Sequence, residues 1–269
     1  MKSCNILSIA GSDPSGGAGI QADLKTFSAL GGYGMAVITA LTAQSTTGVT
    51  GVHEVPPEFV AHQLETLLRD VRVDAVKIGM LGGTGTIDAV AAVLDTHRPP
   101  NVVLDPVMVA KSGDRLLAPE AIEAVRTELL PRVHLITPNL PEAAELLGED
   151  EASDLSAMRG QADRLIELGA SQVLLKGGHL GGRTSTDLLA ARDAPAEDFT
   201  AERVHTANTH GTGCTLSSAI AALRPRRPDF REAVRDAKSY LTEALHRAEE
   251  LDVGRGTGPV HHFHSWWPA

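Results

Sequence analysis

The stretch "CNILSIAGSDPSGGAGIQADLKT", residues 4–26, decides the fold class because it joins an apolar run to a helical pattern through a glycine-rich turn. Residues 4–11 are nearly all apolar, as expected of a strand that is buried on both faces of a sheet. A helix that follows such a strand is typical of the repeating unit of a parallel sheet. This first segment therefore predicts an α/β protein.

The same alternation continues along the whole chain. Further apolar runs occupy residues 34–43, 74–80, 101–106, 133–138 and 172–178. Helical patterns lie among and after them, at residues 57–71, 86–97, 155–169 and 228–251. This order predicts a mostly parallel central sheet with helices on both faces. Because no repeat or low-complexity linker interrupts it, we expect a single domain over residues 1–269.

Composition excludes several classes of partner. The formal net charge is −10 and no run of Lys or Arg is present, which argues against nucleic acid and membrane surfaces as partners. The two cysteines, Cys4 and Cys214, have neither metal-site nor disulfide-framework spacing. The N-terminus lacks a long apolar signal region, and no apolar stretch approaches the roughly 20 residues that span a bilayer. We expect a soluble, cytoplasmic protein.

Polar and small residues follow the predicted strands. In a parallel sheet, ligands bind at the carboxyl ends of the strands. The residues at these ends are Gly11-Ser12-Asp13, Gln44, Gly79-Met80, Asp105-Pro106, Pro138-Asn139 and Lys176-Gly177. Glycines, amides, an acid and a lysine are thus delivered to one edge, which predicts a ligand site there.

The turn after the first strand contains Gly17-x-Gly19-x-x-Ala22, which matches the weak dinucleotide-binding fingerprint. That fingerprint needs an acidic residue about 20 positions further on, for a ribose hydroxyl. The chain has Gln44 and no acid in that region. A flexible substrate loop fits the segment better than a dinucleotide site.

The sequence favours neither a P-loop nor a histidine-rich metal site. The chain has no G-x-x-x-x-G-K-[ST] pattern, which excludes a P-loop kinase. The run "HHFH" at residues 261–264 is interpreted as surface histidines near the C-terminus, not as a metal site. It lies within "GPVHHFHSWW", which carries both tryptophans and is expected to pack on the body of the protein.

The run "NTHGTGCTLSSAIAAL", residues 208–223, is a glycine-rich turn that leads directly into a helix. Amides at a helix N-terminus lack intrahelical partners and lie at the positive end of the helix dipole, so they bind anions. The amides of Gly211, Thr212, Gly213 and Cys214 are the candidates. The alternative is a plain glycine turn before a buried helix.

These residues resemble the phosphate-transfer signature T-x-G-[AT]-G-[DC] of the ribokinase superfamily. The run "TPNLPEA", residues 137–143, is similar to the N-x-x-E motif of the same superfamily, here Asn139 and Glu142. The resemblance implies that this second motif supports a magnesium and phosphate region. From the residues alone, Glu142 could equally be a first-turn acid that completes a helix cap.

A narrower resemblance covers nearly the whole chain. The segments 6–46, 76–81, 103–113, 174–179 and 258–267 are similar, in order, to the hydroxymethylpyrimidine/phosphomethylpyrimidine kinases of thiamine biosynthesis. The resemblance implies a ribokinase-like fold and two successive transfers of the ATP γ-phosphoryl group. The acceptors are 4-amino-5-hydroxymethyl-2-methylpyrimidine and then its monophosphate. It also implies Mg²⁺ as cofactor and a homodimer.

Roles for individual residues follow from this resemblance. The pyrimidine is expected at Gln44, Asp23, Met80, Val107 and Gly11; ATP at Asn139, Lys176 and Thr212; Mg²⁺ at Asp105 and Glu142; and the transferring group at Gly211, Thr212, Gly213, Cys214 and Lys176. The amide of Gln44 suits an aminopyrimidine because it offers both a donor and an acceptor.

The thiol of Cys214 needs its own account, because sugar kinases of the superfamily have an aspartate base at this position. A thiol is a poorer base, although its pKa of about 8.5 can fall at a helix N-terminus. Our hypothesis is that the second acceptor explains the exchange. A phosphate monoester is already largely ionised at neutral pH, so it needs no base and would be repelled by an aspartate.

Two alternatives stay open on sequence grounds. Pyridoxal is also a hydroxymethyl heteroaromatic, so a pyridoxal kinase is possible, with Cys214 capturing the aldehyde. A non-catalytic binding protein for a vitamin precursor is the other, although it would have no use for Lys176 and the glycine turn.

Overall fold

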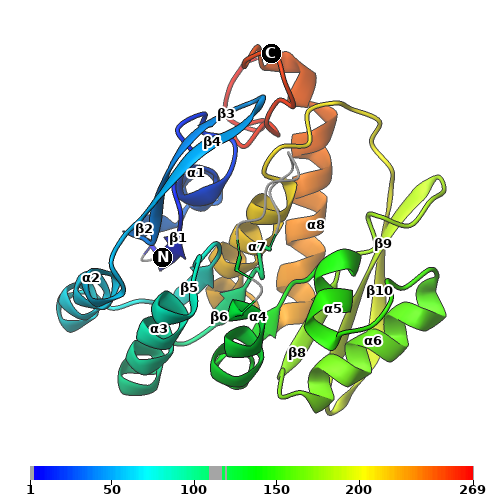
Figure 1. Cartoon of the computed structure of the whole chain (residues 1–269). Coiled ribbons are helices and arrows are strands. Elements are labelled where there is room, and N and C mark those ends of the chain that lie inside the picture. The colour runs from blue at the N-terminus through cyan, green and yellow to red at the C-terminus, as the bar shows by residue number, and fades with distance from the viewer. Residues whose placement is uncertain (1–2, 109–116, 119, 269) are drawn as a thin grey trace.

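The computed structural model describes residues 3–108, 117–118 and 120–268. An eight-stranded sheet crosses the molecule in the order β10-β9-β8-β7-β6-β5-β1-β2 (Figure 1). Its strands are β1 (Asn5–Ala10), β2 (Tyr33–Ile38), β5 (Ala75–Ile78), β6 (Val102–Leu104), β7 (Leu135–Ile136), β8 (Gln172–Leu175), β9 (Thr184–Ala191) and β10 (Ala194–Glu202). The six strands β8, β7, β6, β5, β1 and β2 are parallel to one another. Strand β9 pairs antiparallel with β8 and with β10. The mostly parallel sheet is therefore confirmed.

Helices cover both faces of this sheet because successive strand residues point to opposite sides. Ile6 belongs to a core formed with α1, α7 and α8, while Leu7 belongs to a core formed with α2, α3, α5 and α6. The helices are α1 (Gly19–Ala29), α2 (Pro57–Asp70), α3 (Thr84–His97), α4 (Ala121–Ala124), α5 (Leu140–Leu147), α6 (Leu155–Glu167), α7 (Thr212–Leu223) and α8 (Phe230–His246). Among the described residues, none of the helices combines the length and apolar character needed to cross a membrane.

The apolar run at residues 34–43 is two strands, so the prediction of one strand was wrong. The chain leaves the main sheet at Thr39, whose amide donates to Ala10 O at 3.1 Å and whose hydroxyl donates to Met80 O at 2.6 Å. The next residues form β3 (Ala40–Ser45), which pairs only with β4 (Gly48–Glu54). Figure 1 shows this hairpin beside the C-terminal segment.

The C-terminal segment packs on the body, as expected. Trp266 Nε1 donates to Ala29 O at 2.9 Å, and the Thr257 amide donates to Thr46 O at 3.0 Å. The histidines of this segment are buried, with exposed fractions of 3% for His261, 4% for His262 and 8% for His264. The interpretation as surface histidines was therefore wrong, because the tail folds inward against α7 and α8.

Candidate active site

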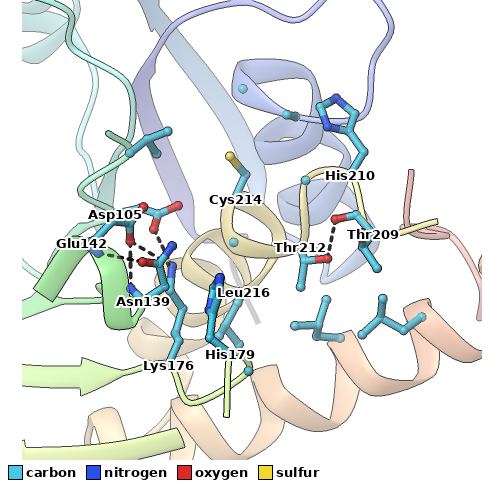
Figure 2. A pocket seen from close by; sticks show the side chains of 18 of the residues that line it. Asp105, Asn139, Glu142, Lys176, His179, Thr209, His210, Thr212, Cys214 and Leu216 are labelled. Carbon is cyan, nitrogen blue, oxygen red and sulfur yellow. Dashed lines mark hydrogen bonds and ion pairs between the residues drawn. The ribbon is translucent and has the colours of Figure 1, made fainter. Parts of the chain in front are cut away.

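A cavity of about 780 Å³ lies at the carboxyl edge of the parallel strands, beside the start of α7. All of the residues that the sequence nominated line it except Asp23. They are Gly11, Gln44, Met80, Asp105, Val107, Asn139, Glu142, Lys176, Gly211, Thr212, Gly213 and Cys214. In Figure 2, Asp105, Asn139, Glu142 and Lys176 gather on one side of the α7 start, and Thr209, His210 and Thr212 lie on the other.

The turn before α7 is built to present amides. Gly211 has φ +77°, a left-handed conformation that glycine adopts without a Cβ penalty. A Cβ there would also lie 1.7 Å from Gly17 O. In the part of the chain that the structure describes, the amides of Gly213 and Cys214 donate to no protein acceptor. They are therefore free to bind an anion in the cavity, at the positive end of the helix dipole.

A lysine and two carboxylates converge next to this turn. Lys176 Nζ lies 3.0 Å from Asp105 Oδ1 and 3.8 Å from Glu142 Oε2. Burial alone would lower the pKa of Lys176, but the charge of Asp105 raises it overall, so the ammonium stays protonated. Burial opposes ionisation of Asp105 too, yet Lys176 and Lys77 lower its pKa. The position of a Cβ on Gly213 would be 3.4 Å from Lys176 Nζ, so the lysine reaches the amide turn.

Asn139 and Glu142 form a capping box at the start of α5. The Glu142 amide donates to Asn139 Oδ1 at 2.8 Å, and Glu142 Oε2 accepts from the Asn139 amide at 2.8 Å. The cap reading of Glu142 is thus confirmed. Burial raises the pKa of this carboxyl to about 7.

The acidic groups also fit a metal ion. Asp105 and Glu142 approach one point, the Lys176 ammonium, from different strand ends. Mg²⁺ is commonly held by one or two carboxylates together with phosphate and water oxygens. No group of three or more acidic, His or Cys ligands with metal-site geometry occurs in the described chain. The pair therefore suits a cation that arrives with a phosphate ligand.

Cys214 occupies the first turn of α7 and is a neutral thiol. Burial raises its pKa to about 11, although the nearby Lys77 charge pulls it down. Of the two states that sequence reasoning left open, neutral or partly ionised, this environment favours the neutral thiol. A thiol that keeps its proton is not a base at neutral pH.

Asp23 is the nominated residue that the cavity does not expose. Its side chain is fully buried and accepts hydrogen bonds from Lys77, Ser8 and Ser218. The expected contact with the pyrimidine therefore has no support in this geometry. Sequence reasoning also missed Lys77, which is fully buried yet lines the cavity. The sequence feature that could have identified Lys77 is that it is a single lysine inside an otherwise apolar strand.

Gln44 lies on β3, outside the parallel sheet. Its side chain is half-buried, and its Oε1 accepts from the Thr42 hydroxyl at 3.2 Å. Gly11 and Met80 lie together on the same side of the cavity, where a Cβ on Gly11 would be 3.1 Å from Met80 Cε. The glycine, the apolar Met80 side chain and the Gln44 amide thus line the same cavity.

A buried pair, His210 and Asp13, also escaped sequence reasoning. His210 Nε2 lies 2.7 Å from Asp13 Oδ2, and the same carboxylate accepts from the amides of Gly17 and Ala18. A Cβ on Gly17 would lie 2.3 Å from the His210 ring. The loop at residues 11–19 is therefore a hydrogen-bonded turn docked on the amide turn.

The far end of the cavity holds further ordered polar groups that the sequence did not single out. Asp187 accepts from the Gly177 amide at 3.0 Å and from Lys238 Nζ at 2.6 Å. Arg203 donates to Gly178 O at 2.8 Å and binds further carbonyls of the loop that ends at Thr184. These contacts fix the segment that follows Lys176.

A site that offers unpaired helix-start amides to an anion, with a protonated lysine and carboxylates beside them, is suited to phosphoryl transfer. On this sheet it makes the protein a small-molecule kinase of the ribokinase-like class.

The comparisons with known proteins agree with this class. The model of the phosphomethylpyrimidine kinase family matches residues 13–261, and the chain belongs to that family. A hydroxymethylpyrimidine/phosphomethylpyrimidine kinase of Salmonella typhimurium is 57% identical over 267 residues, 99% of this chain and 100% of that protein.

Solved structures are also similar. The phosphomethylpyrimidine kinase of Clostridium difficile 630 has a TM-score of 0.80 at 42% identity, covering 90% of this chain and all of that one. An ADP complex of Bacillus subtilis pyridoxal kinase has a TM-score of 0.89 at 36% identity, covering 97% and 98% of the two chains.

Proposed function

We propose that this kinase transfers the γ-phosphoryl group of ATP to 4-amino-5-hydroxymethyl-2-methylpyrimidine and then to the resulting monophosphate, giving the diphosphate for thiamine biosynthesis. The names of the most similar relatives support this substrate, and the ADP complex of the B. subtilis relative supports the nucleotide. The observation that carries the proposal is the meeting of the free amides of Gly213 and Cys214 with Lys176 and Asp105.

The pyrimidine lies at the end of the cavity formed by Gln44, Gly11, Met80 and Val107. The Gln44 amide pairs with the ring nitrogen and amino group, since an amide side chain matches that donor–acceptor edge. Met80 and Gly11 pack on the ring faces. This orientation directs the hydroxymethyl group toward the start of α7.

In each transfer, the acceptor oxygen forms a bond to the γ-phosphorus while the bond to the bridging oxygen breaks, and ADP leaves with that oxygen. In the first transfer the hydroxyl proton passes to a phosphoryl oxygen and from there to water, whereas the acceptor oxygen of the second transfer is already ionised. The transition state is loose and carries its charge on the equatorial oxygens, so stabilising that charge is the main task of the protein. The free amides of Gly213 and Cys214 face these oxygens, and Lys176 adds a full positive charge; the Thr212 amide, also nominated by the sequence, instead donates to Thr209 O at 3.3 Å. Asn139 and Thr212 contact the nucleotide.

Asp105 and Glu142 are the residues that would hold Mg²⁺, which would supply neutralisation of phosphate charge. The chain itself contributes the arrangement of these carboxylates around Lys176. The neutral Cys214 neither removes a proton nor repels an anionic acceptor, so it tolerates both an alcohol and a phosphate at one position.

The protein acts in the cytoplasm as a homodimer. Support for self-association comes from apolar side chains on the β3–β4 hairpin, where Leu41 is 47% and Val52 is 49% exposed. Light scattering coupled to size exclusion tests this assignment, because the monomer mass is 28.3 kDa.

A second candidate function is pyridoxal phosphorylation, favoured by the 0.89 TM-score to the B. subtilis pyridoxal kinase. One assay separates the candidates: ATP and Mg²⁺ with hydroxymethylpyrimidine, its monophosphate or pyridoxal, with products resolved by mass. Diphosphate from both pyrimidines is the expected result. Turnover of pyridoxal alone would assign the protein to the second candidate, and turnover of none would favour a binding protein.

A further inference from the structure

The buried pair of Lys77 and Asp23 takes no part in the transfer of the phosphoryl group. Lys77 Nζ lies 2.9 Å and 3.0 Å from the two carboxylate oxygens of Asp23, and both side chains are fully buried. Replacing such a pair by apolar residues is often neutral or stabilising, so a buried ion pair is weak evidence of a purely structural role.

The pair is oriented with respect to the cavity. Lys77 lines the cavity and Asp23 does not. Asp23 lies behind the lysine, where it accepts hydrogen bonds of 2.6 Å from the hydroxyls of Ser8 and Ser218. The positive member of the pair is therefore the one nearer to any ligand in the cavity.

The lysine head lies at the ligand-binding edge of the sheet. Residues two apart on a strand share a face, and the position of a Cβ on Gly79 would be 2.7 Å from Lys77 Nζ. The ammonium thus extends past the last residue of β5 to Gly79, next to Met80 of the cavity wall. Burial alone would lower the pKa of Lys77, but the Asp23 charge raises it overall, so the lysine is a permanent cation.

This cation acts on the two acceptors differently. The alcohol is neutral, whereas a phosphate monoester carries a charge of −1.5 to −2 at pH 7. An anion that enters a buried site loses hydration, and a fixed positive charge offsets that loss. The neutral alcohol neither needs this charge nor is hindered by it.

We propose that Lys77 is a specificity-determining residue that admits the phosphorylated acceptor, and that Asp23 sets the strength of its positive field. Lys77 acts through charge and position behind the cavity wall and exchanges no atoms with substrate. The inference rests on the proposed function, because it concerns the monophosphate of that reaction sequence.

The test uses the ratio of kcat/KM for the monophosphate to kcat/KM for the alcohol, at saturating ATP and Mg²⁺. Lys77→Met lowers this ratio by about 10-fold because it removes the positive charge, whereas Lys77→Arg keeps the charge and holds the ratio within about threefold of wild type. A fall in the ratio that occurs in Lys77→Met and not in the charge-retaining Lys77→Arg is not expected of a structural role, which would lower both activities alike.

Lys238→Met is the matched control. Lys238 is also a buried lysine, paired with Asp187 at 2.6 Å at the far end of the cavity. Its loss is expected to change both reactions equally and leave the ratio unaltered. Circular dichroism and thermal unfolding verify that each variant is folded.

The double variant Lys77→Gln/Asp23→Asn keeps the test decisive if Lys77→Met does not fold, because it leaves no unpaired buried charge. The ratio falls in this variant too, since the positive charge nearer to the ligand is lost, and an unchanged or raised ratio in the folded double variant would overturn the inference. If the wild-type protein phosphorylates neither pyrimidine, the proposed function fails instead, so the two failures are distinguishable.

Discussion

Replacing Gly211 by alanine tests whether the turn before α7 positions the amides that bind the transferring phosphoryl group. The glycine combines φ +77° with an approach to the loop at residues 11–19 so close that a Cβ would lie 1.7 Å from Gly17 O. A side chain there forces the turn to move, and with it the amides of Gly213 and Cys214.

The structure separates two effects of this substitution. A left-handed backbone costs a non-glycine residue about 1–2 kcal/mol. In a chain of this size, each kcal/mol lowers the Tm by about 2–4 °C. Strain alone therefore predicts a fall of about 2–8 °C, and the contact with Gly17 adds to it. Displacing one donor of an oxyanion-type site lowers kcat by about 100- to 1,000-fold. We expect that loss for both acceptors.

Gly148→Ala provides the control for strain. Gly148 ends α5 with φ +70°, nearly the value at Gly211, but the nearest atom to its Cβ would be a flexible arginine nitrogen at 3.7 Å. We expect a similar stability loss from strain and an unchanged kcat. Steady-state kinetics with mass-resolved products, together with thermal unfolding, measure both quantities. A folded Gly211→Ala protein whose kcat stays within threefold of wild type would refute the assignment of the amide turn.

Three other outcomes follow from the same geometry. Cys214→Asp is expected to lower kcat/KM for the monophosphate at least about 10-fold more than for the alcohol, because the new carboxylate repels the anionic acceptor. Cys214→Ser is the uncharged control. A Cys214→Asp protein that keeps the second transfer and loses only the first contradicts this account. Because burial raises the pKa of Glu142 to about 7, activity at subsaturating Mg²⁺ should rise from pH 6 to pH 8 as the carboxylate ionises. Glu142→Gln should abolish this rise. The same pH profile in the variant as in wild type argues against a role of Glu142 in the rise. Burial would raise the pKa of Asp13, but the hydrogen bond from His210 and its other partners lower it from 3.8 to about 2. The ionised form therefore adds about 2 kcal/mol of stability, which is present above pH 4 and is lost as the pH falls toward 2. Urea unfolding of Asp13→Asn should show less stability at pH 7 and a weaker dependence of stability on acid pH, and curves parallel to wild type speak against the pair.

The fold was predictable from the sequence because its signals are local. A strand buried on both faces needs a continuous apolar run, so β1, β5 and β8 could each be located within a few residues. The exit of the chain at Thr39 was not predictable in the same way. The run at 34–43 stays apolar across the break, which shows in the hydrogen bonds of Thr39 to Ala10 of β1 and to Met80 after β5.

The sequence predicted which strand ends form the site, but not how the charged side chains there pair with one another. Topology alone brings the residues after β5, β6, β7 and β8 to one edge. The partner of a charge depends on contacts across long sequence separations: Lys77 meets Asp23 from 54 residues away, and His210 meets Asp13 from 197 away. For the same reason the ionisation state of Cys214 stayed open on sequence grounds, because the burial that raises its pKa depends on residues far apart in the chain.

The two lysines of the site differ in one respect that fits them to different tasks. Lys176 and Asp105 both line the cavity, so an arriving cation can take the carboxylate while the lysine turns to a phosphate oxygen. Asp23 is closed off behind Lys77 and is held by two serine hydroxyls, so no ligand in the cavity can replace it. The first pair is therefore suited to exchange partners when the nucleotide binds, as both transfers require. The second keeps a constant charge beside the acceptor, which matters only when the acceptor itself changes from an alcohol to a phosphate.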